Sequence, residues 1–122
     1  MARREAHTDR VTEPRTALPP EWGPRRRVSL AELREHREEI LAAGREHGVL
    51  AVRVFGSVAR GDATDESDLD LLVDVAPEAG LFRLTGFALY VERLVRVHTQ
   101  LATTGGLKPW LRDHILAEAV PL

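Results

Sequence analysis

A short stretch of the sequence contains residues whose types and spacing suit a phosphate and metal site. Gly56 and Ser57 follow an apolar run, and ten residues separate Ser57 from Asp68, with Asp70 two positions later. A glycine-serine turn that opens a helix exposes backbone amides and adds a hydroxyl, so it can hold a phosphate. On a strand, Asp68 and Asp70 share one face, where Mg²⁺ finds the hard oxygen ligands it prefers. We therefore expect a phosphate turn that faces a magnesium site.

Each part of this pattern also has an ordinary structural interpretation. A Gly-Ser pair is often only a turn, and an Asp-x-Asp pair is often a solvated strand end. Arg60, beside Gly61, either reaches the phosphate or is solvated. The complete string is more specific, because it arises by chance on the order of once in a thousand. The string as a whole therefore favours the phosphate and metal site.

The hydrophobic pattern predicts the elements that position these residues. Ser29 and Glu32 have the spacing of a helix capping box, and the run over 68–75 has the continuous apolar centre of a strand covered on both faces. The predicted helices are 29–47, 56–61, 81–95 and 107–120, and the predicted strands are 49–55, 68–75 and 97–103. This order predicts an α/β fold, with a three- or four-stranded sheet and flanking helices.

Composition narrows the class of protein. The chain has 122 residues, 43% hydrophobic and 30% charged, with no cysteine, which is enough for one globular domain and excludes disulfides and thiolate metal sites. Residues 1–27 hold seven Arg and four Pro, so we expect a flexible extension there, with Trp22 as a possible docking residue, followed by one domain over 28–122. The domain is acidic, which argues against direct nucleic-acid binding. We expect a cytoplasmic protein that does not enter membranes.

Residues 55–61 (FGSVARG) and 67–73 (SDLDLLV) resemble the minimal nucleotidyltransferases of the DNA polymerase β superfamily, and residues 115–122 (ILAEAVPL) are similar to that group's ending. The resemblance implies a small polymerase β palm-like fold with a mixed sheet. It implies that Gly56 and Ser57 hold the nucleotide phosphates and that Asp68 and Asp70 bind Mg²⁺ and act in catalysis. Arg60 is a further candidate for binding the nucleotide. Relatives of this size transfer AMP from ATP to a Tyr of a HEPN toxin, so the resemblance implies a HEPN-type partner and an antitoxin role.

One departure from this family concerns its third carboxylate. The expected position falls at Gln100, with His98 on the same predicted strand face. Gln offers no charge, whereas His can act as a base near neutral pH. Three hypotheses follow: an Mg²⁺-dependent adenylyltransferase antitoxin, a catalytically weak antitoxin that acts by binding alone, and nucleotidyl transfer to a small molecule. The last fits less well, because the chain is too short for the extra substrate domain that such enzymes carry.

Overall fold

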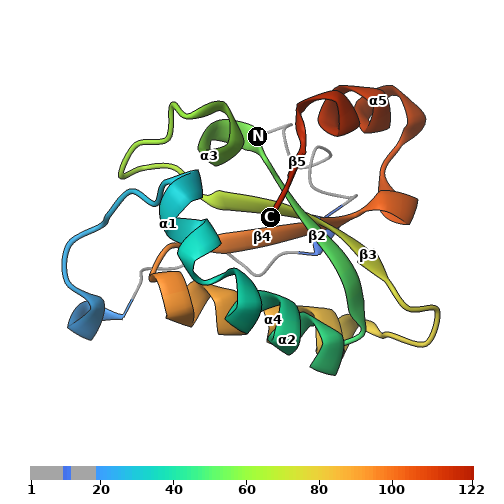
Figure 1. Ribbon diagram of the computed structural model, residues 1–122, viewed down its shortest axis with the longest axis horizontal. Helices are drawn as coiled ribbons and strands as arrows, with labels where there is room; N and C mark the ends of the chain where they lie inside the picture. The colour runs from blue at the N-terminus through green and yellow to red at the C-terminus, as the bar shows by residue number, and fades with distance from the viewer. Residues whose placement is uncertain (1–9, 12–18) are drawn as a thin grey trace, which may run out of the picture.

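The computed structural model describes residues 10–11 and 19–122, and its described part is built on one mixed sheet (Figure 1). Three long strands form the centre: β2 (Val49–Phe55), β3 (Leu69–Val75) and β4 (Thr99–Thr103). Two short strands, β1 (Arg10–Val11) and β5 (Val120–Pro121), lie at the edges, giving the order β1-β4-β3-β2-β5. β3 runs parallel to β4, and the other pairs are antiparallel. The α/β class and the mixed sheet are as predicted, and the edge strands are added to the three predicted ones.

The helices begin and end at residues with clear local causes. α1 (Leu30–Glu35) starts at Ser29, whose hydroxyl accepts a hydrogen bond from the Glu32 amide at 3.0 Å, as the capping-box spacing predicted. The prediction of a single helix over 29–47 is wrong in one respect, because the helix is interrupted at His36. The His36 amide donates back to the Leu33 carbonyl at 3.0 Å, which tightens the last turn of α1, and α2 (Arg37–Glu46) starts at the next residue.

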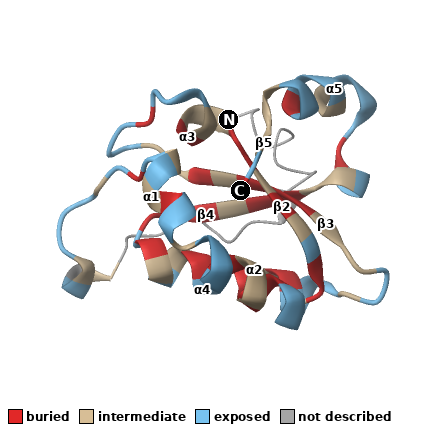
Figure 2. Cartoon of the chain, in the orientation of Figure 1, coloured by how far each residue is buried: buried red, intermediate tan, exposed pale blue. Residues whose placement is uncertain are grey.

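The sheet is covered on both faces, as the apolar centre of β3 predicted. On one face, α1, α2 and α4 (Leu81–Val95) bury a large core that includes Leu33, Ile40 and Phe87. On the other face, α5 (Pro109–Glu118) covers a smaller core, which consists of Phe55, Leu72, Ala102, Leu107 and Ile115. Figure 2 shows the buried central strands between these exposed helix surfaces. The smaller core does not extend to the first residues of β3, so Asp68 and Asp70 remain half-buried.

The C-terminal segment departs from the prediction of a helix over 107–120. α5 ends at Glu118 because Ala119 is extended, with φ −70° and ψ 139°. The chain then pairs with β2, with Val120 opposite Val54. A short 3-10 turn, η3 (Thr104–Gly106), connects β4 to this region. The sheet thus gains an edge strand directly beside the residues that lead into the Gly-Ser turn.

Most of the predicted flexible extension, residues 1–9 and 12–18, lies outside the described residues. After the 3-10 turn η2 (Pro20–Trp22), Arg25 donates to the Asp65 carbonyl at 2.9 Å. Arg26 donates to the Val95 carbonyl at 2.7 Å and forms an ion pair with Glu32 at 2.6 Å. The described residues just before the domain therefore lie against it. No helix in the described part of the chain combines the length and the apolar character needed to cross a membrane.

Candidate functional site

The Gly-Ser turn lies where β2 passes into the short helix α3 (Gly56–Arg60). Phe55 is extended, with φ −135° and ψ −177°. Gly56 has φ +77°, a left-handed backbone conformation that residues other than glycine rarely adopt. α3 ends at Gly61, which is also left-handed, with φ 86°. In the antiparallel register of β2 and β3, Phe55 lies opposite Asp70. The register therefore places Asp70, one of the two predicted aspartates, beside the turn.

Gly56 lies in direct contact with Asp70. A Cβ atom added at Gly56 would be 2.5 Å from Asp70 Oδ2, a distance at which one of the two groups must move. A side chain at Gly56 is thus disfavoured both by the backbone conformation and by the nearby Asp70 carboxylate. The sequence predicted that a phosphate approaches the backbone at Gly56, and in the structure the group that lies against this glycine is the Asp70 carboxylate.

Asp68 and Asp70 are held at the start of β3, and both are half-buried. They lie on the same side of the sheet as Leu72, which packs under α5. In the parallel register of β3 and β4, Asp70 lies beside Gln100, and the Gln100 side-chain amide donates to Asp68 Oδ2 at 2.9 Å. The structure therefore brings Gln100, a candidate from the sequence for the position of the third carboxylate, to the aspartate pair.

His98, the other residue considered for that position, is held by α4. Its Nδ1 is hydrogen-bonded to Glu92 Oε1 at 2.9 Å, and the same oxygen accepts the Thr99 amide at 3.0 Å. His98 is only 8% exposed. Burial raises the pKa of Glu92, but the hydrogen bonds from His98 and the Thr99 amide, with the nearby charge of Arg93, outweigh burial, so the pKa of Glu92 is lowered. Glu92 is therefore an ionised acceptor that fixes the His98 ring.

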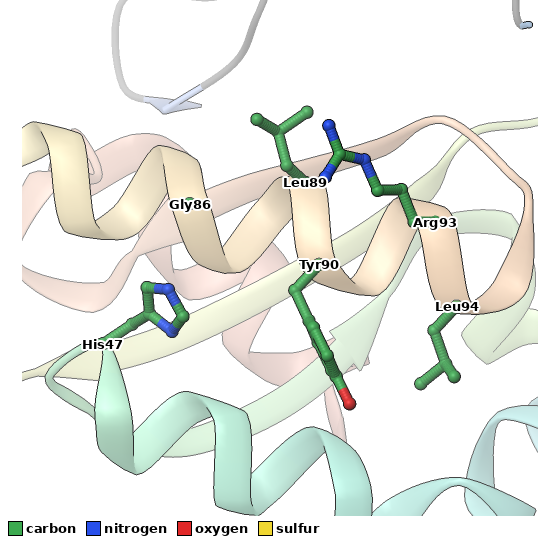
Figure 3. A pocket seen from close by; sticks show the side chains of 6 residues that line it. All are labelled: His47, Gly86, Leu89, Tyr90, Arg93 and Leu94. Carbon is green, nitrogen blue, oxygen red and sulfur yellow. The ribbon is translucent and has the colours of Figure 1, made fainter.

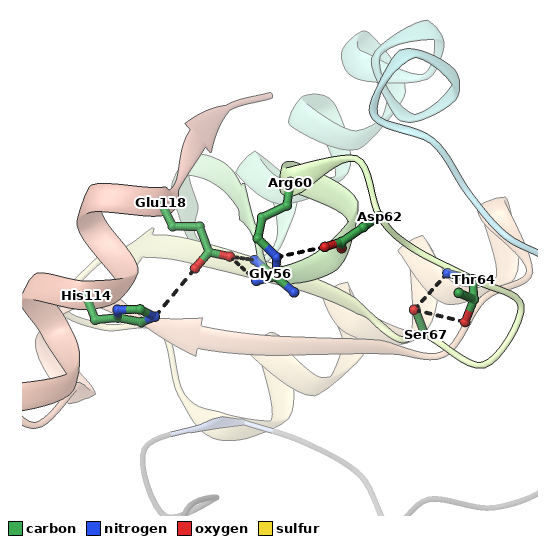
Figure 4. Close-up of polar contacts among 7 residues, drawn as sticks. All are labelled: Gly56, Arg60, Asp62, Thr64, Ser67, His114 and Glu118. Atoms are coloured by element: carbon green, nitrogen blue, oxygen red, sulfur yellow. Dashed lines mark hydrogen bonds and ion pairs between the residues drawn. The ribbon is translucent and has the colours of Figure 1, made fainter.

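Glu118, at the end of α5, is the residue of this site that sequence reasoning missed. Its Oε2 accepts hydrogen bonds from the Gly56 amide and from Arg60, both at 2.7 Å, and its side chain is only 16% exposed (Figure 4). The Gly56 amide, expected from the sequence to be available to a phosphate, is thus bonded to a carboxylate. The C-terminal motif contained this acid, but nothing in the one-dimensional pattern placed it on the turn.

Arg60 lies between two carboxylates. Its Nη1 donates to Glu118 Oε2 at 2.7 Å, and its Nε donates to Asp62 Oδ2 at 3.3 Å. The hydrogen bond to Asp62 is the largest influence on the pKa of Arg60, and together with the charges of both acids it exceeds the opposing effect of desolvation, so the pKa is raised. Arg60 therefore stays cationic beside the turn. The following loop is ordered by its own polar groups, since the Thr64 amide donates to Ser67 Oγ at 2.9 Å (Figure 4).

The Gly-Ser turn, Arg60, Asp70 and Glu118 border one cavity of about 320 Å³. Its polar lining consists of the turn residues Gly56, Ser57 and Arg60 with Asp70, His114 and Glu118, and its apolar lining of Phe55, Leu111 and Ile115. Asp70 and the Gly-Ser turn therefore face the same space, which is what a phosphate held next to a cation requires. Asp68 and Gln100 do not line this cavity. Their hydrogen bond lies next to it, because Gln100 pairs with Asp70 in the sheet and Asp68 is two residues before Asp70.

A larger cavity, of about 560 Å³, lies elsewhere on the molecule (Figure 3). It is lined by α4 and the end of α2, through His47, Gly86, Leu89, Tyr90, Arg93 and Leu94. None of these residues is acidic, and α4 covers the face of the sheet opposite α5. Size alone would select this cavity, but it lacks the carboxylates and the glycine turn, so the smaller cavity is the better candidate for nucleotide chemistry.

Comparison with known proteins agrees with this reading of the fold. Residues 33–122 match the nucleotidyltransferase domain, so this chain belongs to that family. A solved minimal nucleotidyltransferase is 43% identical and superposes with a TM-score of 0.71, covering 78% of this chain and 97% of that one. The predicted family membership and the predicted nucleotidyltransferase fold are therefore confirmed.

Two further comparisons concern a curated relative and a solved structure. Protein adenylyltransferase MntA of Thermococcus cleftensis is 33% identical over 91 residues, which cover 70% of this chain and 92% of the relative. A crystal structure of a toxin–antitoxin with AMP-PNP has a TM-score of 0.60 at 16% identity, covering 69% of each chain. This second likeness concerns the fold alone.

Proposed function

We propose that this chain is an Mg²⁺-dependent protein adenylyltransferase that acts in the cytoplasm as the antitoxin of a HEPN-type toxin, by transferring AMP from ATP to a Tyr of that toxin. One observation carries the proposal: the Gly-Ser turn and Asp70 are in contact and face one cavity. The relationship to a protein adenylyltransferase and the fold shared with a toxin–antitoxin protein support the choice of reaction and partner.

The donor set fits Mg²⁺ when a nucleotide is present. Asp68 and Asp70 would provide hard carboxylate oxygens on one strand face, and no group of three or more His, Cys, Asp or Glu in the described residues forms a complete metal cage. Mg²⁺ usually keeps waters and phosphate oxygens as its other ligands, so two carboxylates suit a site that is completed by ATP. Mg²⁺ bound there would neutralise charge that develops on the phosphates during transfer.

The chain's own residues would then bind and orient the nucleotide. The Ser57 hydroxyl can donate to a phosphate oxygen in the cavity that it shares with Asp70, and cationic Arg60 adds positive charge to the turn. In the transfer, the acceptor hydroxyl oxygen bonds to the α-phosphorus, the bond to the β-phosphate breaks, and pyrophosphate leaves. The hydroxyl proton must pass to a base, for which His98, oriented by Glu92, is the candidate.

The hydrogen bond from Gln100 to Asp68 favours a second candidate function, a catalytically weak antitoxin that binds its partner without modifying it. A neutral amide lies where the resemblance calls for an acid, and it donates to a carboxylate that the metal would need. The loss of one negative ligand weakens cation binding, and the loss of a base costs typically 10²–10⁴ in rate. A binding-only antitoxin would have the same fold, the same partner and the same nucleotide binding, and would differ only in that it does not transfer AMP.

Two measurements test the proposal. Calorimetric titration with Mg²⁺ and ATP should show binding to the natural protein, and Asp70→Asn should weaken it at least tenfold, whereas the matched strand variant Asp74→Asn should not. Mass measurement of a purified HEPN-type partner after incubation with Mg²⁺ and ATP should then show a Tyr carrying AMP. An unmodified partner that still forms a stable complex would select the binding-only antitoxin. Absence of ATP binding by the natural protein would refute both.

A further inference from the structure

The C-terminal motif, residues 115–122, ends beside the Gly-Ser turn and is tied to it through the backbone. Val120 pairs with Val54, and the Leu122 amide donates to the Val52 carbonyl at 3.2 Å, so β5 runs along the strand that leads into the turn. Arg34 secures the end of the chain by donating to the Pro121 carbonyl at 2.6 Å and to the Leu122 carbonyl at 3.2 Å. These contacts fix the position of the preceding residues of α5 relative to β2.

Glu118 is the acid that this anchoring delivers to the turn. It lies 62 residues from Gly56 in sequence, yet one of its oxygens accepts both the Gly56 amide and Arg60 (Figure 4). Its other oxygen is 3.8 Å from His114 Nε2. Hydrogen bonds to an ionised acceptor are about twice as strong as neutral ones. Glu118 therefore joins the first and the last residue of α3 to α5.

Gly56 is confined on both sides. Its amide is bonded to Glu118, and its Cα lies so close to Asp70 that an added Cβ would be 2.5 Å from the carboxylate. A small shift of the turn toward or away from α5 would therefore change the separation between the turn and Asp70. The Glu118 contact and the pairing of Phe55 with Asp70 together hold that separation.

We infer that Glu118 is a positioning residue of the proposed nucleotide site, which fixes the Gly-Ser turn and Arg60 at the distance from Asp70 that Mg²⁺ and ATP require. The inference rests on the proposed function, since it assigns Glu118 a role in that same site. Glu118 acts through Gly56 and Arg60 and need not touch the nucleotide. An acid in this position also keeps Arg60 and the Gly56 amide from turning away before ATP arrives.

The opposite role would have the opposite consequence. A carboxylate and a phosphate compete for the same donors, so a Glu118 that merely occupied the phosphate position would have to leave when ATP binds. Removing such an acid would tighten ATP binding, whereas removing a positioning residue weakens it. The direction of the change in affinity therefore separates the two roles.

The experiment compares Glu118→Gln and Glu118→Ala with Asp113→Asn, a matched control that removes an acid from an exposed position of α5. Titration with Mg²⁺ and ATP should give about tenfold weaker binding for Glu118→Gln, more for Glu118→Ala, and no change for Asp113→Asn, as for other groups that orient a metal site. In a double-mutant cycle, Arg60→Gln should weaken binding less when Glu118 is already changed, because the two residues act as one unit.

Amide hydrogen exchange supplies a readout without nucleotide. In Glu118→Ala, the amides of residues 56–60 should exchange faster, while those in the middle of β3 keep their natural rates. Unchanged or tighter ATP binding by the Glu118 variants would overturn the positioning role and leave the proposed function intact. Failure of the natural protein to bind ATP would refute the proposed function; unchanged exchange at residues 56–60 would separately refute the anchoring of the turn.

Discussion

Gly56→Ala tests the contact between the turn and Asp70, and Gly61→Ala is its matched control. Both glycines have left-handed backbones, with φ +77° and +86°, but a Cβ at Gly61 meets nothing within 4 Å, whereas one at Gly56 lies 2.5 Å from Asp70 Oδ2. A left-handed backbone costs a non-glycine residue roughly 1–2 kcal/mol. Moving Asp70 off its rotamer adds about 1 kcal/mol. We expect Gly61→Ala to lose stability only through its left-handed backbone, and Gly56→Ala to lose stability through both its backbone and the displacement of Asp70.

Thermal and calorimetric assays measure these two terms. Each 1 kcal/mol corresponds to a fall in melting temperature of roughly 4–8 °C for a domain of this size, so Gly56→Ala should melt below Gly61→Ala by that interval. Mg²⁺·ATP affinity should fall about 10–100-fold in Gly56→Ala, because the displaced Asp70 no longer holds the cation, and should stay unchanged in Gly61→Ala. Gly56→Val should impair function more than Ser57→Ala, which removes about one hydrogen bond.

A double mutant provides the decisive control. In an Asp70→Ala background, the clash at Gly56 disappears, so adding Gly56→Ala should cost no more stability than Gly61→Ala costs in the natural chain. Equal melting temperatures and equal ATP affinities for Gly56→Ala and Gly61→Ala would refute the reasoning, since they would mean that Asp70 tolerates a side chain on the turn.

Three further predictions concern residues around the sheet. Gln100→Asp, which replaces the amide bonded to Asp68, should lower the melting temperature without Mg²⁺, restore it with Mg²⁺ and ATP, and raise transfer to the partner. Glu92 has a lowered pKa, so its ionised form stabilises the folded protein at neutral pH, and this stabilisation is lost as the pH falls below about 4.5. Unfolding curves measured at several pH values should therefore lose this acid dependence in Glu92→Gln. Arg26→Ala should reduce the free energy of unfolding by about 1 kcal/mol in denaturant titrations, because it loses the hydrogen bond to the Val95 carbonyl at a partly exposed site.

Each of these has a contrary outcome. Transfer by Gln100→Asp that stays at the natural level would show that this position does not limit the reaction. Acid unfolding curves that coincide for Glu92→Gln and the natural chain would assign the acid dependence to other carboxylates. An Arg26→Ala variant as stable as the natural chain would make the contacts of that arginine energetically neutral, as many surface pairs are.

The sequence by itself determined the three central strands and the place of the Gly-Ser turn. The centre of the run over 68–75 is apolar on both faces because β3 lies between two cores, and this predicted the strand without any knowledge of its neighbours. The two-residue period placed Asp68 and Asp70 on one face, and Ser29 with Glu32 marked the first helix start. These features are local, so the pattern of residue types contains them.

Only the tertiary structure decided which elements meet at the site. Gln100 reaches Asp68 across 32 residues, and Glu118 reaches Gly56 across 62, because strand order and register bring these segments together. Periodicity assigns a side chain to a face but does not say which strand or helix lies beside it. The strand after Glu118 depends in the same way on tertiary structure, because pairing with β2 overrides the helical pattern there.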